Sequence, residues 1–301
     1  ALFFPLVDVL GSLGTCLVLW FGGTGVIGGS ISLGVLVAFM SYVTRFFMPI
    51  REISMLYNNV QSALAATERI TEVADATPEV KEAENAVQLP RIKGEVRFNH
   101  VSFGYEPNTY VLKDIDLEIN ENQRVALVGP TGAGKTSLAN LAARFYDPQE
   151  GTITVDDYDL REVSLKSLRS QMGIVLQDPF LFTGSIRENI AYGRPDASEQ
   201  EIVEAAKAVG AHDFIMNFTQ GYDTNVGERG IRLSMGQRQL ISVARALLAN
   251  PRILILDEAT SSVDTRTEVL IQKAMENLMQ GKTAFIIAHR LSTITRADRI
   301  V

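Results

Sequence analysis

The residues best suited to chemistry form a glycine-rich run that ends in a lysine and a threonine. Residues 129–136 read GPTGAGKT and fit the pattern G-x-x-x-x-G-K-[ST]. Glycines in such a loop let backbone N–H groups surround phosphates, and a following helix N-terminus adds positive potential. Lys135 would then reach the β and γ phosphates of a nucleotide, and Thr136 would ligate Mg²⁺. A chance glycine-rich loop is disfavoured, because a strand is expected over 123–128 and a helix over 137–144.

A pair of acidic residues ends a second apolar strand, expected over residues 252–256. Strand ends in an open α/β sheet face the ligand crevice, so Asp257 and Glu258 would face the nucleotide. Asp257 can hold Mg²⁺ through water, and Glu258 can polarise the attacking water as a general base. Two carboxylates that merely terminate a strand are the alternative, and the phosphate loop upstream disfavours it.

A third candidate opens a strongly helical run. Residues 233–239 read LSMGQRQ, and the helix expected over 240–249 stops at Asn250 and Pro251. Ser234 is a typical N-cap residue, and the helix N-terminus behind it is another place where anions bind. An ordinary capped helix fits the same pattern, so the local sequence leaves both interpretations open.

The first fifty of the 301 residues predict membrane helices. Only Asp8 and Arg45 are charged there, and residues 1–21 and 31–48 are apolar stretches. A spanning helix needs about 20 apolar residues to cross about 30 Å of hydrocarbon. The glycine-rich segment 22–30 predicts a tight turn between two antiparallel spans.

The second span predicts the orientation of the chain. Arg45 and Arg51 at its far end indicate that this end faces the cytoplasm. Apolar residues at helical spacing extend the helix past Pro49, where a kink is expected. Asp8 could line a substrate path, but we favour a position near the cytoplasmic end that reaches water.

Composition disfavours several classes of protein. With 28 basic against 35 acidic residues the formal net charge is −7, which argues against a nucleic-acid binder. The single cysteine, Cys16, excludes an intrachain disulfide and a cysteine-based zinc site. Residues 23–28 fit the dinucleotide fingerprint G-x-G-x-x-G, but that motif needs a preceding strand, whereas a membrane helix is expected here.

Taken in order, these motifs resemble the ATP-binding cassette (ABC) transporter superfamily, specifically exporters that fuse membrane helices to the ATPase on one chain. The resemblance covers nearly all of the sequence. It implies a multidomain chain. The first part is an all-α transmembrane segment that forms the last two spans of a six-helix bundle. The second part is an α/β P-loop NTPase domain of ABC type with an antiparallel β subdomain and a helical subdomain. We expect the membrane region over 1–75 (spans about 1–21 and 31–50), a linker over 76–93 and the nucleotide-binding domain over 94–301, and we expect the natural chain to extend beyond both ends.

The resemblance assigns roles to further residues. Tyr105 in VSFGY takes the position of the aromatic residue that stacks on adenine, and Gln177 that of the glutamine that reaches Mg²⁺ and the attacking water. His289, after an apolar strand, matches the histidine that contacts the γ-phosphate. Residues 226–230 resemble the exporter loop that contacts the intracellular helix ends, and residues 261–264 resemble the D-loop.

The complete candidate site falls into three overlapping groups. The expected catalytic residues are Glu258, His289, Gln177 and Lys135. The residues expected to bind ATP are Tyr105, Gly129, Thr131, Gly132, Ala133, Gly134, Lys135, Thr136, Ser137, Gln177, Ser234, Gly236, Gln237 and Asp264. The expected Mg²⁺ ligands are Thr136, Gln177 and Asp257.

The resemblance also implies partners and a location. Two cassettes of this family pair head to tail, so Lys135 and Tyr105 of one face Ser234 and Gly236 of the other. The expected partners are a second half-transporter, identical or different, the lipid bilayer and a transported substrate, with no nucleic acid. ATP binding would close the dimer and hydrolysis would reset it. We expect the chain to be located in a cell membrane, the bacterial inner membrane, with its nucleotide-binding domain in the cytoplasm.

One residue departs from the family pattern. Met235 stands where the signature LSGGQ has its first glycine, and it adds bulk where glycine permits close approach of the backbone. We expect a working site, because bulk is tolerable at the start of a helix.

An ATP-driven exporter half is the favoured function, and two alternatives stay open. A membrane-anchored regulator or gated channel would use ATP binding rather than turnover, but a pure binder has no need of Glu258 as a base. A soluble mechanical ATPase of the DNA-repair kind is disfavoured by the apolar first fifty residues and by the acidic charge.

Overall fold

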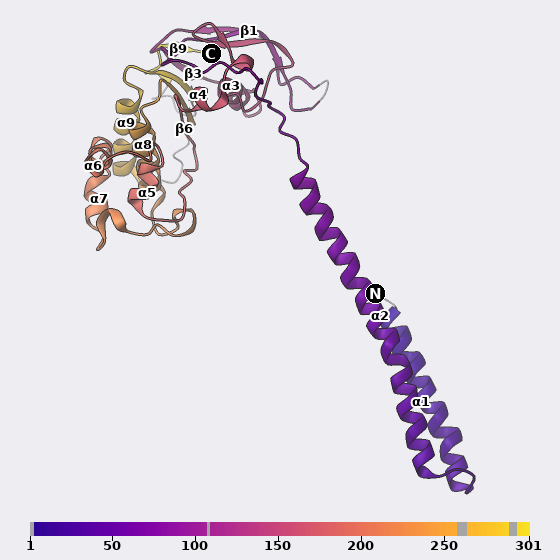
Figure 1. Cartoon of the computed structure of the whole chain (residues 1–301). Coiled ribbons are helices and arrows are strands. Elements are labelled where there is room, and N and C mark those ends of the chain that lie inside the picture. Colours follow the sequence, from indigo (N-terminus) through magenta and orange to yellow (C-terminus); the bar gives the residue numbers. More distant parts are fainter. Residues whose placement is uncertain (1–2, 107–108, 258–263, 289–293) are drawn as a thin grey trace. The chain divides into compact units, whose positions relative to one another are not determined.

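The computed structural model describes residues 3–106, 109–257, 264–288 and 294–301 (Figure 1). The chain divides into two compact units, Ala1–Pro78 and Glu79–Val301.

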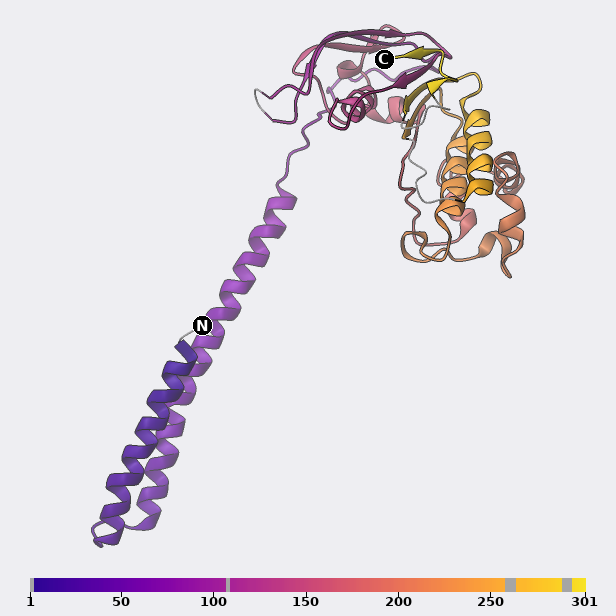
Figure 2. The ribbon, with the colours of Figure 1, turned by 180° about the vertical axis from the view of Figure 1, so that it is seen from behind.

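The first unit is a pair of antiparallel helices, α1 (Phe3–Ile27) and α2 (Leu33–Ala74). They lie side by side, as the indigo and purple ribbons of Figures 1 and 2 show from two sides. Small residues permit this close approach, because a Cβ added at Gly22 would lie only 2.5 Å from a side-chain carbon of Leu36. Both helices are long and apolar enough to cross a membrane. Large apolar side chains such as Trp20 and Phe21 point outward and are exposed, as lipid-facing residues would be.

The turn between these helices is shorter than expected. Helix α1 continues to Ile27, so the helical segment takes in most of the predicted turn 22–30, and Ser32 caps α2 through the N–H of Val35. Glycine is more frequent in membrane helices than in soluble ones, which is why a glycine-rich run misleads there. The dinucleotide candidate 23–28 is preceded by helix rather than by a strand, as expected. Helix α2 runs through Pro49.

The described residues of the second unit form two sheets. The antiparallel sheet has the strand order β2-β1-β4-β5, and the parallel sheet has the order β6-β7-β8-β3-β9. The antiparallel strands are β1 (Val96–Phe103), β2 (Leu112–Ile119), β4 (Glu150–Val155) and β5 (Tyr158–Asp159). The parallel strands are β3 (Arg124–Leu127), β6 (Met172–Val175), β7 (Ile253–Asp257), β8 (Thr283–Ile287) and β9 (Arg299–Ile300).

Helices cover both faces of the parallel sheet. The α-helices of this unit are α3 (Lys135–Ala142), α4 (Leu165–Arg169), α5 (Ile186–Ala191), α6 (Glu199–Ala208), α7 (His212–Met216), α8 (Met235–Ala249) and α9 (Thr265–Met279). Among the residues that the structure describes there are also three short 3₁₀ helices, η1 (Leu160–Glu162), η2 (Gly221–Asp223) and η3 (Glu228–Gly230). Helices α5 to α9 gather into a helical subdomain (Figure 1).

Strand β7 joins two hydrophobic cores. Ile253 and Ile255 belong to the core between the two sheets, which includes α3, whereas Leu254 and Leu256 belong to the core of the helical subdomain. This follows from the period of two along a strand, since alternate side chains point to opposite faces. A strand covered on both faces must be apolar along its covered length, which is why residues 253–256 read as ILIL.

The second unit also includes most of the segment expected to be a linker. Residues 81–93, here called the strap, are hydrogen-bonded along the surface of this unit. The carbonyl of Lys81 accepts from Arg144, and the carbonyl and N–H of Val87 both bond to the segment 162–164. Further along, the side chain of Gln171 bonds to the N–H of Ile92 and to the carbonyl of Pro90. The strap is therefore an integral component of the second unit.

Candidate functional site

The phosphate loop has the predicted strand–loop–helix context. Strand β3 ends at Leu127 and helix α3 begins at Lys135. Two glycines between them are required by geometry, because Gly132 and Gly134 have φ values of +88° and +86°. A Cβ at Gly134 would also lie 2.6 Å from a side-chain carbon of Leu112. Gly134 caps α3 without a side-chain hydrogen bond, so the helix begins with N–H groups that a phosphate can satisfy.

Lys135 folds over its own loop. Its ammonium donates hydrogen bonds to the carbonyl of Gly129, at 2.8 Å, and to the carbonyl of Pro130, at 3.0 Å. These contacts hold the positive charge over the turn of the loop. Phosphate oxygens carry full negative charge and bind an ammonium more strongly than a carbonyl does, so they would displace these partners.

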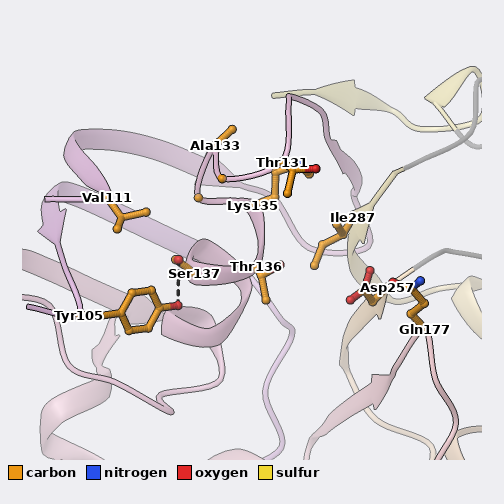
Figure 3. Close-up of a pocket in the computed structure, with 12 residues that line it drawn as sticks. Tyr105, Val111, Thr131, Ala133, Lys135, Thr136, Ser137, Gln177, Asp257 and Ile287 are labelled. Atoms are coloured by element: carbon orange, nitrogen blue, oxygen red, sulfur yellow. Dashed lines mark hydrogen bonds between the residues drawn. The ribbon is translucent and has the colours of Figure 1, made fainter.

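A cavity of about 510 Å³ opens beside this loop (Figure 3). It brings together ten residues predicted from sequence: Tyr105, Thr131, Gly132, Ala133, Gly134, Lys135, Thr136, Ser137, Gln177 and Asp257. Two further lining residues, Val111 and Ile287, were missed. Ile287 is the last residue of β8, so the rule that strand ends face the crevice could have found it. No local pattern marks Val111.

One end of the cavity is aromatic. Tyr105 makes edge-to-face contacts with Phe103 and Tyr146, with ring centroids 5.0 and 5.2 Å apart. Its hydroxyl lies 2.9 Å from the hydroxyl of Ser137 on α3 (Figure 3). Tyr105 remains 52% exposed, which leaves apolar ring surface for a ligand. A purine base would stack on such a ring.

The opposite end of the cavity carries oxygen donors. Gln177 follows β6, and Asp257 ends the neighbouring strand β7, so adjacent strand ends bring the two side chains together (Figure 3). Thr136 at the start of α3 lines the same space. A hydroxyl, an amide oxygen and a carboxylate are the hard ligands that Mg²⁺ prefers, and few protein ligands suffice when phosphates complete the coordination. The donor set therefore fits Mg²⁺ bound together with a nucleotide.

Five predicted nucleotide-binding residues do not line this cavity: Gly129, Ser234, Gly236, Gln237 and Asp264. Ser234, with Gln237, forms a capping box at the start of α8, in which the hydroxyl accepts from the Gln237 N–H at 3.2 Å. The N-cap expected at Ser234 is confirmed, and Gly236 is buried in the first turn of the helix. Asp264 caps α9 through the Thr267 N–H at 3.0 Å, and this hydrogen bond lowers the pKa of its carboxyl group. Two predicted catalytic residues, Glu258 and His289, and D-loop residues 261–263 lie outside the described residues.

A second hollow, of about 450 Å³, joins the segment after Gln177 to the loop 226–230. It is lined by Asp178, Pro179, Phe180, Glu228, Arg229, Ile231 and Arg238. Helix α8 supports this segment, because the guanidinium of Arg245 donates to the carbonyls of Phe180 and Asn189. Burial lowers the pKa of the Arg245 guanidinium below its usual value. The structure therefore links the segment that carries Gln177 to the helix that begins at Ser234.

Comparison with known proteins decides the family. The profile of the family described as ABC transporter matches residues 112–261, which include the phosphate loop, Gln177 and Asp257. An uncharacterized ABC transporter ATP-binding protein of Bacillus subtilis is 50% identical over 301 residues, covering 100% of this chain and 50% of the relative. The chain belongs to the ABC transporter superfamily. An ATP-dependent lipid A-core flippase of Syntrophus aciditrophicus is 47% identical to this ABC chain, again over 100% of the chain and 50% of the relative.

The fold comparison agrees with the sequence comparison. The structure of a bacterial Atm1-family ABC exporter with ATP bound matches with a TM-score of 0.72 and 41% identity, covering 98% of this chain and 51% of that chain. The exporter-type architecture expected from the sequence, two membrane helices followed by an ABC nucleotide-binding fold with antiparallel and parallel sheets, is confirmed. This ABC chain spans about half the length of the curated relatives that it matches.

Proposed function

We propose that this chain is the ATPase domain, with the adjoining two membrane spans, of an ABC exporter half-transporter that uses ATP to move a substrate out across a membrane. The observation that carries the proposal is the cavity that gathers Tyr105, the phosphate loop, Gln177 and Asp257, on a chain whose other unit is a pair of apolar helices. The proposed domains are a membrane region over residues 1–75, a linker over 76–93 and the nucleotide-binding domain over 94–301.

The binding steps follow from the two ends of the cavity. Tyr105 stacks on the adenine, while the backbone N–H groups of residues 131–136 surround the phosphates. Lys135 leaves the carbonyls of Gly129 and Pro130 and binds the β and γ phosphates. Mg²⁺ neutralises phosphate charge when it is bound, and Thr136, Gln177 and Asp257 would hold it there.

The chemical step needs a base next to the Mg²⁺ ligands. Glu258 directly follows Asp257 in the chain, and we assign it the role of general base that polarises the attacking water. Gln177 orients that water, and His289 contacts the γ-phosphate. The catalytic effect comes mainly from positioning and from neutralisation of charge by Lys135.

One chain leaves this site incomplete. Ser234, Gly236 and Gln237 begin α8 outside the cavity, so we assign them to the nucleotide site of a second cassette, which supplies the same residues in return. Helix α8 has 15 residues, and the positive end of its dipole would then face the γ-phosphate of the partner's nucleotide. ATP thereby stabilises the closed pair, and hydrolysis removes the group that bridges the two cassettes.

The hollow beside Gln177 offers a route from this closure to the membrane. It lies between the segment after Gln177 and the loop that contains Glu228, and we propose that the intracellular ends of membrane helices bind there. Closure of the cassettes would then move those ends and switch the spans from inward-facing to outward-facing. The proposed location is the inner membrane of a bacterium, with the second unit in the cytoplasm.

The test uses the full-length protein reconstituted in lipid nanodiscs. We expect Mg²⁺-dependent ATP hydrolysis that vanadate inhibits, together with ATP-dependent approach of two cassettes measured by spin-label distances. The variant Glu258→Gln should bind ATP with unchanged affinity and hydrolyse it at least about 100-fold more slowly, the lower end of the range for loss of a general base. Tight ATP binding without turnover in the unmodified protein would contradict the proposal and favour the regulator or channel instead.

A further inference from the structure

We propose that Gln149 is a positioning residue for adenine recognition, because its side chain holds the backbone of Gly104 and thereby fixes the ring of the next residue, Tyr105. This inference rests on the proposed stacking role of Tyr105. It adds a residue outside the nucleotide motifs, one that does not line the cavity itself.

The contact between Gln149 and Gly104 uses both ends of the side-chain amide. The Oε1 atom of Gln149 accepts the N–H of Gly104 at 2.7 Å, and its Nε2 atom donates to the carbonyl of Gly104, also at 2.7 Å. Both distances are at the short end of the range for N–H···O hydrogen bonds. The backbone of Gln149 is fixed as well, since its N–H donates to the carbonyl of Ser102 on β1.

Gly104 needs these partners because strand pairing stops before it. The last paired residue of β1 is Phe103, opposite Leu112, so the buried backbone groups of Gly104 lie beyond the ladder. A side chain is impossible at this position, because an added Cβ would lie 1.9 Å from the carbonyl oxygen of Thr109. Glycine gives the backbone wide torsional freedom just before Tyr105, and the Gln149 amide removes that freedom.

The ring of Tyr105 is otherwise held by weak or exchangeable contacts. These are the hydroxyl pair with Ser137 at 2.9 Å (Figure 3) and the edge contacts with Phe103 and Tyr146. Stacking requires the ring to be in the right plane before the base arrives, since ordering it during binding costs affinity. Loss of the Gln149 contact should therefore weaken the binding of adenine and leave the binding of the phosphates unchanged.

The chain offers a matched control in Gln171. Its Oε1 atom accepts the N–H of Ile92 at 2.9 Å, and its Nε2 atom donates to the carbonyl of Pro90 at 2.8 Å. The chemistry is the same as at Gln149, but the segment that it holds is the strap, which does not line the cavity. Replacement of either glutamine by methionine keeps the side-chain length and removes the hydrogen bonds of its amide, which at Gln171 include one to the carbonyl of Ser167.

The experiment is a double-mutant cycle on the full-length protein in nanodiscs. Calorimetry measures the dissociation constants of ATP and of inorganic tripolyphosphate, both with Mg²⁺, for Gln149→Met, Tyr105→Ala, the double variant and Gln171→Met. Stacking on an aromatic side chain contributes to the free energy of binding, so we expect Tyr105→Ala to weaken ATP binding about 5- to 100-fold. We expect Gln149→Met to weaken it about 3- to 20-fold, with the tripolyphosphate constant unchanged, and the double variant to be no weaker than Tyr105→Ala.

The outcomes separate this inference from the proposed function. Equal loss of ATP and tripolyphosphate affinity in Gln149→Met would show a merely structural role and overturn the inference. Additive losses in the double variant would overturn it too. So would a loss of ATP affinity in Gln171→Met equal to the loss in Gln149→Met. Unchanged ATP affinity in Gln149→Met would also overturn it. Unchanged ATP affinity in Tyr105→Ala would instead remove the stacking role on which the inference rests, and the inference with it.

Discussion

The ammonium of Lys135 lies 2.8 Å from the carbonyl oxygen of Gly129, within the same phosphate loop. The lysine is thus already held at the place where phosphate charge would arrive, and little rearrangement is needed for it to bind a nucleotide. Preorganised charge of this kind stabilises a transition state without a cost of reorganisation at the moment of reaction.

Replacement of Lys135 by methionine should abolish this effect. We expect ATP turnover to fall about 100-fold or more, because loss of one preorganised donor typically costs about 10²–10³ in rate. ATP affinity should fall as well, since the phosphates lose their cationic partner. Steady-state hydrolysis and calorimetry measure the two effects. Lys113→Met, at an exposed position on β2, is the control and should behave as the unmodified protein; equal losses in both variants would contradict the assignment.

Met235→Gly should leave turnover equal to that of the unmodified protein or raise it modestly. The thioether sulfur of Met235 lies 3.5 Å from a guanidinium nitrogen of Arg238, which also donates to the carbonyl of Leu233. Glycine would remove the weak sulfur contact and allow closer approach of a phosphate, while the Ser234 cap that begins the helix remains. Hydrolysis rates of the two proteins in nanodiscs decide the matter. A severe loss would mean that the sulfur–guanidinium contact is needed for function.

Arg144→Met should be strongly destabilising. The guanidinium of Arg144 is buried, with the residue 1% exposed, and it bonds to Asp147 and to the carbonyls of Lys81, Arg161 and Val163. Its loss leaves these acceptors without their donor, and breaking a buried pair in this way costs about 3–5 kcal/mol. For a unit of this size that corresponds to a fall of about 10 °C in the midpoint of thermal unfolding, measured by calorimetry.

The control for this prediction is Arg169→Met. The guanidinium of Arg169 donates to the carbonyl of Arg144 at 2.7 Å and stacks on the ring of Phe145. It serves fewer acceptors, so we expect a loss of about 1 kcal/mol and a shift of only a few degrees. Equal shifts in the two variants would show that the number of buried acceptors does not determine the cost.

The pair of Asp298 and Arg124 predicts a pH-dependent contribution to stability. Arg124 donates its side-chain and backbone N–H groups to the carboxylate, and these hydrogen bonds lower the pKa of Asp298 below its ordinary value of 3.8. Since the folded pKa is the lower one, the stabilisation is complete above the ordinary value and disappears as the pH falls through the folded value. The pair is more than a third exposed, so the contribution is at most about 1 kcal/mol.

The corresponding variant is Asp298→Asn. We expect its free energy of unfolding to be lower than that of the unmodified protein at about pH 7, and the difference to shrink below about pH 4. Thermal midpoints measured across this range give the profile. A difference that stayed constant down to about pH 3 would show that the carboxylate charge is not responsible.

Local patterns predicted most of the nucleotide site. The phosphate loop was recognisable because its glycines, lysine and flanking strand and helix are contiguous in sequence. The acidic end of β7 and the cap at Ser234 were recognisable for the same reason, since each depends on neighbours within a few residues.

Contacts between distant segments were not predictable in this way. The Gln149 side chain meets Gly104 across 45 residues, and Gln171 meets the strap across 79 residues at Ile92. Nothing in the surroundings of either glutamine marks it as different from a solvated surface residue. The prolines and charges of the strap are typical of a linker, and the hydrogen bonds that order it come from partners far along the chain.

The Arg144 hydrogen bond to Lys81 sets the length of the tether between the two units. Helix α2 ends at Ala74, so seven residue steps separate it from the first anchored carbonyl, and a fully extended chain of that length reaches at most about 25 Å. Were Val87 the first anchor, the reach would nearly double. One buried guanidinium thus limits the length of unanchored chain between helix α2 and the cassette. A displacement of either unit beyond that length must pull on the other unit.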